Sequence, residues 1–195
     1  MNKKSGFTIL EVIISGVFIV VLGMGILGLQ SIIGQSQLVS MNSFHSVSGA
    51  TEAVSVLSRE LRTARRGEDG SFTFEYANDQ EIIFFADTNA NGTTEKLHYF
   101  VEGGILKKTI TEATGTPAQY LADNQQTKII TQHFKNTGQP IFTYFDLNNN
   151  VLPTPADLNS IKMIKIYIRT NPVNNPSTDY VLQSQVQIRT LKEDI

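Results

Sequence analysis

The chain has 195 residues, of which 41% are hydrophobic and 17% are charged, and its 16 basic and 18 acidic residues give a net charge of −2. This length predicts one domain of ordinary size, and the charge balance predicts no strongly basic surface, so we expect no nucleic-acid partner. The chain has no cysteine, which excludes disulfide frameworks, zinc ribbons and thiol nucleophiles.

The N-terminal region reads as a membrane-spanning helix. Residues 7–29 contain one charged residue and are long enough to cross a hydrocarbon core of about 30 Å. Lys3 and Lys4 precede this run, and no further basic residue follows before Arg59. The positive-inside rule therefore places residues 1–6 in the cytoplasm and the C-terminal part outside. The run is too long for an ordinary secretory signal peptide, which also ends in a small-x-small cleavage site.

The one charge in this run is Glu11. A carboxylate inside hydrocarbon costs at least a few kcal/mol, so an acid in a membrane span indicates a function. The alternative is a carboxylate near the membrane boundary that water reaches or that stays protonated. Residues 3–11, KKSGFTILE, are a short basic leader ending in Gly6, then Phe-Thr and a glutamate at the fifth position after the glycine. This segment resembles the type III signal of type IV prepilins and type II secretion pseudopilins.

The resemblance implies a processing step and an assembly contact. Prepilin peptidase would cut between Gly6 and Phe7 and would methylate the new N-terminal amine of Phe7. Glu11 would then neutralise the Phe7 amine of a neighbouring subunit as the helix joins a filament. Residues four apart share a helix face, and a carboxylate in the first turn is favoured by the helix dipole. A buried ion pair is costly but can fix register, so we expect Glu11 to set axial position.

The helix is expected to continue beyond the membrane, because the first proline is Pro117. We predict a leader at 1–6, a membrane and filament-core helix at 7–34, and an amphipathic continuation at 35–66. One apolar stripe with steps of three and four defines the continuation: Leu38, Met41, Phe44, Val47, Ala50, Val54, Leu57, Leu61 and Ala64. Gly23, Gly25 and Gly28 weaken the helix, and we favour local unwinding on assembly over close packing of small residues.

From residue 71 the hydrophobic period changes toward two, which predicts strands at 71–76, 81–86, 96–102, 105–112, 128–134, 141–145, 161–170 and 180–190. Gly103-Gly104 predicts a hairpin turn, and residues 113–127 a polar loop or short helix. The globular region 67–195 thus gives an α+β fold, with a long helix packed on an antiparallel sheet. This pattern is similar to the pilin architecture.

Two Asp/Asn-rich segments could hold a metal ion. Residues 87–95, DTNANGTTE, begin like a calcium loop, but His98 stands where the loop needs its bidentate glutamate. We favour a hairpin turn between two strands over a calcium site. The second segment, 146–150, is likewise interpreted as a turn. No residue set suggests a nucleophile, a phosphate loop or a metal centre, so we predict no enzyme activity and no cofactor.

These observations predict a minor pilin or pseudopilin stored in the inner membrane and assembled into an extracytoplasmic filament. The string Ser58–Ala64 resembles the same region of W-type minor pilins and J-type pseudopilins, and the two Asp/Asn turns resemble turns of W-type minor pilins. The implied partners are prepilin peptidase, other pilins or pseudopilins, the inner-membrane assembly platform, and lipid before assembly. The alternative is a membrane-anchored binding module for calcium, sugar or DNA, displayed by a pilin-type leader.

Overall fold

The computed structural model describes residues 8–131, 134–136, 138–171 and 179–188, without the side chains of residues 38, 39, 42, 43, 45 and 46. The predicted cleavage residues Gly6 and Phe7 therefore lie outside the described residues, as does the ring of His45. The chain divides into two compact units, Met1–Asn42 and Ser43–Ile195.

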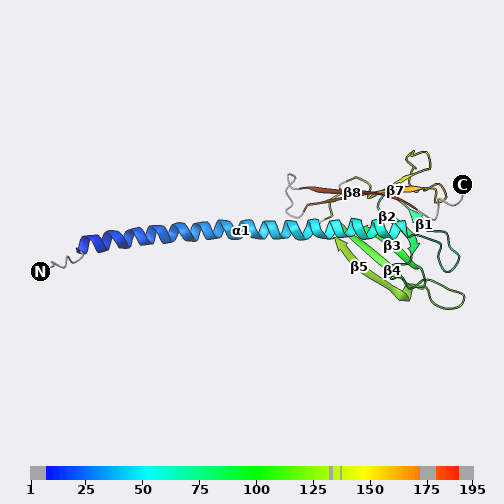
Figure 1. The fold of residues 1–195 in the computed structure, drawn as a ribbon, viewed down its shortest axis with the longest axis horizontal. Coiled ribbons are helices and arrows are strands. Elements are labelled where there is room, and N and C mark those ends of the chain that lie inside the picture. The colour runs from blue at the N-terminus through cyan, green and yellow to red at the C-terminus, as the bar shows by residue number, and fades with distance from the viewer. Residues whose placement is uncertain (1–7, 132–133, 137, 172–178, 189–195) are drawn as a thin grey trace. The chain divides into compact units, whose positions relative to one another are not determined.

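The first unit is the N-terminal part of helix α1 (Ile9–Arg62) (Figure 1). Thr8 begins the helix: its carbonyl accepts the N–H groups of Glu11 and Val12, and its hydroxyl Oγ1 lies 3.3 Å from the amide of Glu11. Gly23, Gly25 and Gly28 all lie within the helix, so this chain shows no break there. Unwinding on assembly stays a prediction.

The second unit contains a five-stranded antiparallel sheet with the strand order β1-β2-β3-β4-β5. Gly103 and Gly104 join β3 to β4 with φ angles of 59° and 73°, which confirms the predicted two-residue turn. A short 3-10 helix, η1 (Ala122–Asn124), precedes β5. The strands are β1 (Phe74–Ala77), β2 (Glu81–Ala86), β3 (Glu95–Glu102), β4 (Ile105–Thr111) and β5 (Gln125–Thr131).

A separate three-stranded antiparallel sheet follows, with the order β6-β7-β8. Its strands are β6 (Phe142–Phe145), β7 (Met163–Thr170) and β8 (Tyr180–Gln187). We expected one sheet; two form because β6 pairs with β7 instead of extending β5. Ile141 and Phe142 instead donate their N–H groups to the carbonyl of Asp79, which ties the start of the second sheet to the turn between β1 and β2.

Both sheets bury their apolar faces against the same part of α1. The helix contributes Ala50, Ala53, Val54, Leu57 and Leu61, which belong to one hydrophobic cluster with residues of both sheets. The strands give this cluster large side chains that are fully buried: Phe84, Leu97, Tyr99, Phe142, Tyr144, Ile164 and Ile166. The hydroxyl of Ser58 also donates to that of Ser184 on β8, at 2.9 Å. The α+β prediction of one long helix on antiparallel strands is confirmed.

The amphipathic part of the helix differs from its prediction at both ends. Ala50, Leu57 and Leu61 are fully buried, but the side chains of Met41 and Phe44 are 59% and 71% exposed. The helix ends at Arg62 instead of residue 66. It stops there because the following residues join the first sheet: Ala64 forms a bridge with Ala86, and the amide of Arg65 donates to the carbonyl of Phe85 at 3.0 Å.

Strand β5 starts three residues before the predicted 128–134, within the segment predicted as loop or short helix. Gln125, Gln126 and Thr127 pair with β4 although they are polar. Both faces of this part of β5 are exposed, so its residues need no apolar alternation. Hydrophobic periodicity reveals which residues are buried, so an edge strand that is exposed on both faces shows little of it.

Candidate functional site

Glu11 is the third residue of α1, and its side chain is exposed in this monomer. The Thr8 side chain and the glutamate three residues later follow the sequence of a capping box, in which the first residue satisfies an amide of the first turn. The carboxylate belongs to the first turn, where the helix N-terminus carries a partial positive charge that attracts acidic groups. Among the residues that the structure describes, none forms an ion pair with Glu11, so its carboxylate is available to a cation that approaches the helix start.

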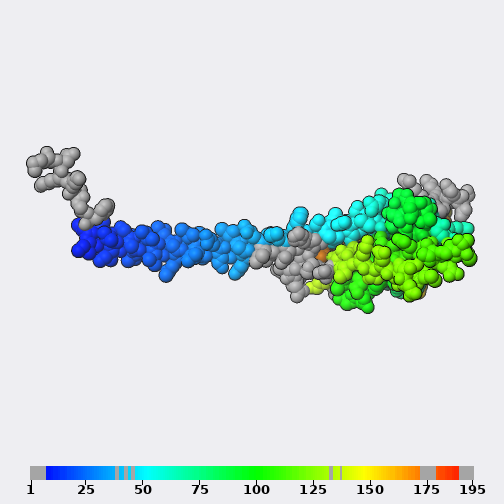
Figure 2. Space-filling view, turned by 90° about the horizontal axis from the view of Figure 1, so that it is seen from below, coloured from blue at the N-terminus to red at the C-terminus, as the bar shows by residue number. Residues whose placement is uncertain are grey.

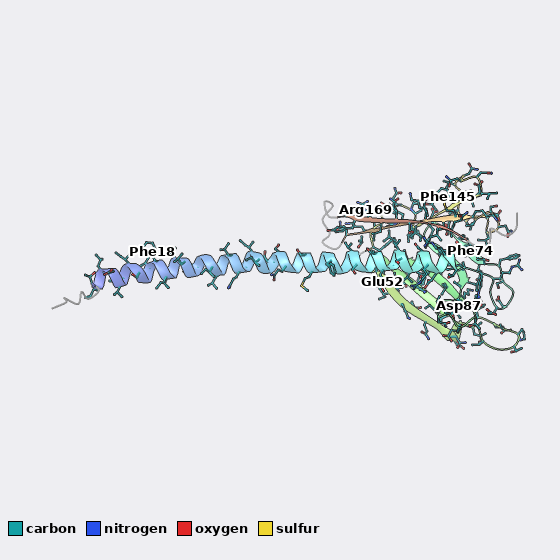
Figure 3. The ribbon with its side chains drawn as sticks, viewed as in Figure 1. Phe18, Glu52, Phe74, Asp87, Phe145 and Arg169 are labelled. Atoms are coloured by element: carbon teal, nitrogen blue, oxygen red, sulfur yellow. The ribbon has the colours of Figure 1, made fainter. Side chains whose placement is uncertain are left out.

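The helix after Glu11 is apolar and uncovered. Residues Ile9–Gln37 form a candidate membrane span with a mean hydropathy of 2.7, and none of its most apolar window is buried within the chain. Figure 2 shows the side chains of this segment, in blue, projecting from the helix, and Figure 3 shows Phe18, which is 64% exposed, pointing away from the backbone. Such a surface is stable only in lipid or against other apolar helices.

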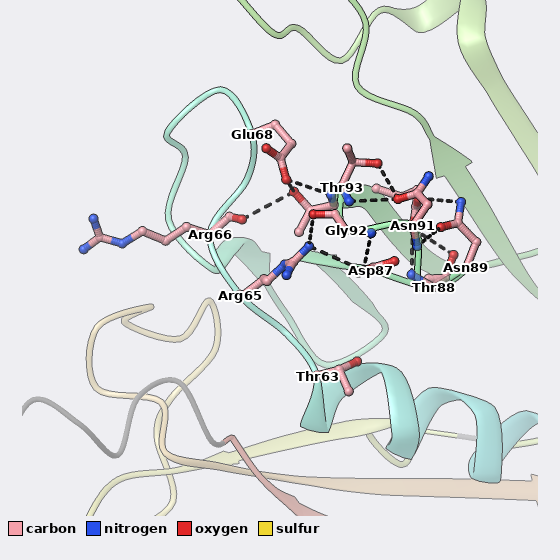
Figure 4. Close-up of polar contacts among 12 residues, drawn as sticks. Thr63, Arg65, Arg66, Glu68, Asp87, Thr88, Asn89, Asn91, Gly92 and Thr93 are labelled. Atoms are coloured by element: carbon pink, nitrogen blue, oxygen red, sulfur yellow. Dashed lines mark hydrogen bonds and ion pairs between the residues drawn. The ribbon is translucent and has the colours of Figure 1, made fainter.

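Residues 87–94 are the turn between β2 and β3, and Glu95 is the first residue of β3. The carboxylates of Asp87 and Glu95 accept hydrogen bonds from this turn, which Figure 4 shows around Asp87. Glu95 is buried; its Oε2 accepts from the amide and hydroxyl of Thr88, and its Oε1 accepts from the side-chain amide of Asn89. Asp87 Oδ2 accepts from the amide of Gly92 at 3.0 Å. The oxygens that a calcium loop would offer to metal are therefore mostly used by N–H and O–H donors.

The chain just after α1 closes over this turn. The Nη2 of Arg65 lies 2.7 Å from the carbonyl oxygen of Gly92 and 3.5 Å from Oδ2 of Asp87. Glu68 Oε1 accepts from the amide and hydroxyl of Thr94, at 2.9 and 3.1 Å. Tyr120 adds a third brace, because its hydroxyl donates to the carbonyl of Thr94 and accepts from the amide of Glu68. Sequence reasoning placed Arg65 in the helix and gave it no role in the turn.

The second Asp/Asn segment is also closed internally. Asp146 Oδ1 accepts from the amide of Asn150 at 2.8 Å, and its Oδ2 accepts from the same residue's side-chain amide at 2.9 Å. Asn149 has a φ of 63°, the left-handed conformation that asparagine tolerates, and Phe145 bridges Val151. The hydrogen bonds from Asn150 hold the pKa of Asp146 below its usual value. The geometry is that of a turn.

A buried charged cluster, Glu60–Lys108–Tyr99, was missed from the sequence. Glu60 on α1 and Lys108 on β4 pair at 2.6 Å, and their side chains are only 6% and 7% exposed. The hydroxyl of Tyr99 donates to the other oxygen of Glu60 at 2.6 Å. Burial, with the negative charge of Glu60, raises the pKa of Tyr99 well above its ordinary value. Alternating polar and apolar residues would have placed Lys108 inward on β4, but the neighbouring Lys107 hides that signal.

A groove lies beside this cluster, between α1 and strands β4 and β5. Its volume is about 350 Å³, and Glu52, which Figure 3 labels on the helix, stands on its lining. The other lining residues are Gly49, Ala53, Val56, Tyr99, Lys108, Ile110, Lys128, Ile129 and Ile130. Within the described part of the chain, no group of three or more His, Asp or Glu side chains is placed to hold a metal ion.

Comparisons with known proteins give a likeness at the level of the fold. No protein-family model matches the chain, and no curated protein matches it in sequence. A solved structure of the GspK-GspI-GspJ complex, from the type 2 secretion system of enterotoxigenic Escherichia coli, contains a chain similar to this one. The match has a TM-score of 0.50 and 8% sequence identity, and it covers 74% of this chain and 97% of that chain. At this identity the likeness concerns the fold alone, which is the pilin-like arrangement of one long helix against antiparallel sheets.

Proposed function

We propose that the chain is a minor pilin or pseudopilin, a non-enzymatic subunit of a type IV filament or a type II secretion-like system. The observation that carries this proposal is the apolar, uncovered helix Ile9–Gln37 with a lone carboxylate, Glu11, in its first turn. A simple membrane anchor has no use for a charge within its apolar run, where a carboxylate costs a few kcal/mol in lipid. The similar chain in the pseudopilin complex supports other pilins or pseudopilins as partners.

Processing and location follow from the leader. Prepilin peptidase cuts after Gly6 and methylates Phe7, and the assembly platform in the inner membrane then extracts the helix from lipid. Lys3 and Lys4 keep the leader in the cytoplasm, while the globular unit stands outside. The finer assignment as W-type or J-type rests on the string Ser58–Ala64 and the two Asp/Asn turns, and it is part of this proposal.

In this mechanism Glu11 does its work between subunits. The helix carries the carboxylate into the filament interior, where the Phe7 amine of a neighbouring subunit neutralises it. Removing one partner of such a buried pair costs about 3–5 kcal/mol, because the other charge stays buried and unpaired. Misplaced subunits leave both charges unpaired and are rejected, so the pair fixes the axial position.

The test is to count the subunit in sheared filaments and in the membrane fraction for the wild type, Glu11→Ala and Glu11→Gln. We expect Glu11→Ala to insert and be cleaved normally but to be lost from filaments, with Glu11→Gln intermediate at best because it lacks the charge. Glu52→Ala is the matched control, since Glu52 is the other acid before Ser58 and its side chain is exposed. Equal recovery of Glu11→Ala and wild type in filaments would remove the register role and leave a membrane-anchored binding module.

A further inference from the structure

The turn between β2 and β3 has the ligand types of a calcium loop, and a cation is present beside it. The guanidinium of Arg65 reaches from the segment after α1 and contacts the carbonyl oxygen of Gly92 and the carboxylate of Asp87. Figure 4 shows this side chain directed at the turn, with both contacts drawn as dashed lines. One backbone carbonyl and one carboxylate are the oxygen types that a bound calcium ion would take from such a loop.

The chain order makes Arg65 a fixed part of this arrangement. Its amide is bound to the carbonyl of Phe85, two residues before Asp87, so the backbone positions of the two residues are coupled. Glu68 and Tyr120 bind Thr94 on the other limb of the turn. The segment after the helix therefore holds both limbs.

The charges also require a counter-ion. The Asp87 side chain is only 16% exposed, and its Oδ1 is buried without a hydrogen-bond partner among the described residues. A carboxylate in that position needs a nearby positive charge, and Arg65 is the basic side chain whose ion pair with it the structure shows. We propose that Arg65 is the internal cation of this turn: it occupies the role of a calcium ion and makes the turn's shape independent of metal.

This inference is independent of the filament role. The turn forms part of the surface of the second unit. Asn89, Asn91 and Thr93 at its tip are exposed, and hydrogen bonds within the turn fix their positions. An arginine that is part of the chain cannot dissociate, so the tip would keep one shape at any calcium concentration outside the membrane. A metal-dependent loop would instead open when calcium is removed.

The experiment is amide hydrogen exchange, followed by NMR on the full chain in detergent micelles, with the Gly92 amide as reporter because it donates to Asp87. We expect Arg65→Met to raise the exchange rate of Gly92 at least about tenfold, since the loss of roughly 1.4 kcal/mol of local stability is a tenfold change. Arg65→Lys should retain most of the protection, because it keeps the charge. Arg62→Met is the matched control, since Arg62 is exposed and lies only three residues away.

A calcium titration distinguishes a cation from a simple hydrogen-bond donor. We expect millimolar calcium to leave the Gly92 resonance of the wild type unchanged and to restore protection in Arg65→Met, where the carboxylate of Asp87 and the carbonyl oxygen of Gly92 have lost the guanidinium. Four outcomes would overturn the proposal. The first is an unchanged Gly92 exchange rate in Arg65→Met. The second is wild-type protection in Arg65→Gln, which keeps hydrogen-bond donors but no charge. The others are calcium binding by the wild-type turn and no restoration of protection by calcium in Arg65→Met.

Discussion

Replacing Glu60 with alanine tests how the helix is attached to the first sheet. Glu60 accepts from the Lys108 ammonium and from the Tyr99 hydroxyl, both at 2.6 Å, and all three side chains are buried. Glu60→Ala removes both acceptors and leaves an ammonium group buried without a counter-charge. Breaking a buried ion pair in this way costs about 3–5 kcal/mol, and leaving the buried hydroxyl of Tyr99 unsatisfied costs about 1–3 kcal/mol. We expect the free energy of unfolding to fall by at least about 4 kcal/mol, the lower end of the two costs together.

The assay is urea unfolding of the full chain in detergent micelles, followed by tyrosine fluorescence, because the chain has six tyrosines and no tryptophan. Lys108→Met should cost as much as Glu60→Ala, since it leaves the carboxylate buried. The double variant Glu60→Gln with Lys108→Met should come within about 1 kcal/mol of the wild type, because the amide oxygen still accepts from Tyr99 and no charge remains.

The control is Glu52→Ala on the same helix, where an exposed carboxylate should change stability by less than about 0.5 kcal/mol. A loss below about 1 kcal/mol in Glu60→Ala would show that water screens the pair, and would refute the expected cost of leaving Lys108 buried without its partner. With Glu60→Gln also measured alone, additive losses in the double variant would show that Glu60 and Lys108 do not act as a pair.

Three further predictions concern processing, autonomy and pH. Co-expression with a prepilin peptidase should remove six residues and add one methyl group to Phe7, while intact-mass detection of the full-length chain would contradict cleavage after Gly6. A fragment that starts near Gln35 should stay soluble and show strand signal by circular dichroism, because the core begins at residue 50; an unfolded fragment would show that the span is needed for folding. Burial raises the pKa of both Tyr99 and Tyr144, so each stays protonated in the fold and its contribution is complete below its unfolded value near 10. Stability should fall as pH rises above about 10, by roughly 1.4 kcal/mol per pH unit for each tyrosine, and a flat urea midpoint between pH 9 and 11 would contradict this.

The parts of the fold that were predicted well are those where burial follows a simple period. Strand β2 lies at the predicted 81–86, and β7 alternates buried and half-buried residues along its whole length. The Gly103-Gly104 turn was predicted because few other residues adopt two successive positive φ angles. The start of β5 was missed because an exposed edge strand carries no such alternation.

The candidate site likewise has one part that the local sequence predicts and another that it does not. The predicted leader, the span and Glu11 are contiguous in the chain, so local sequence is sufficient to predict them; Gly6 and Phe7 lie outside the described residues. The pairing of Glu60 with Lys108, and of Arg65 with the β2–β3 turn, joins residues far apart in the chain. The predicted helix 35–66 included Arg65, and local sequence could not anticipate its partner in the turn.

The sequence by itself determined that this chain has an apolar helix with one acid near its start, followed by alternating strands, because membrane insertion and strand burial each depend on local composition and period. Tertiary structure alone decided where the helix stops, how the strands divide into two sheets, and which charges are buried. Those outcomes depend on which backbone groups and side chains meet across the core: Arg65 leaves the helix to bind Phe85, and Glu60 is buried because Lys108 and Tyr99 lie opposite it.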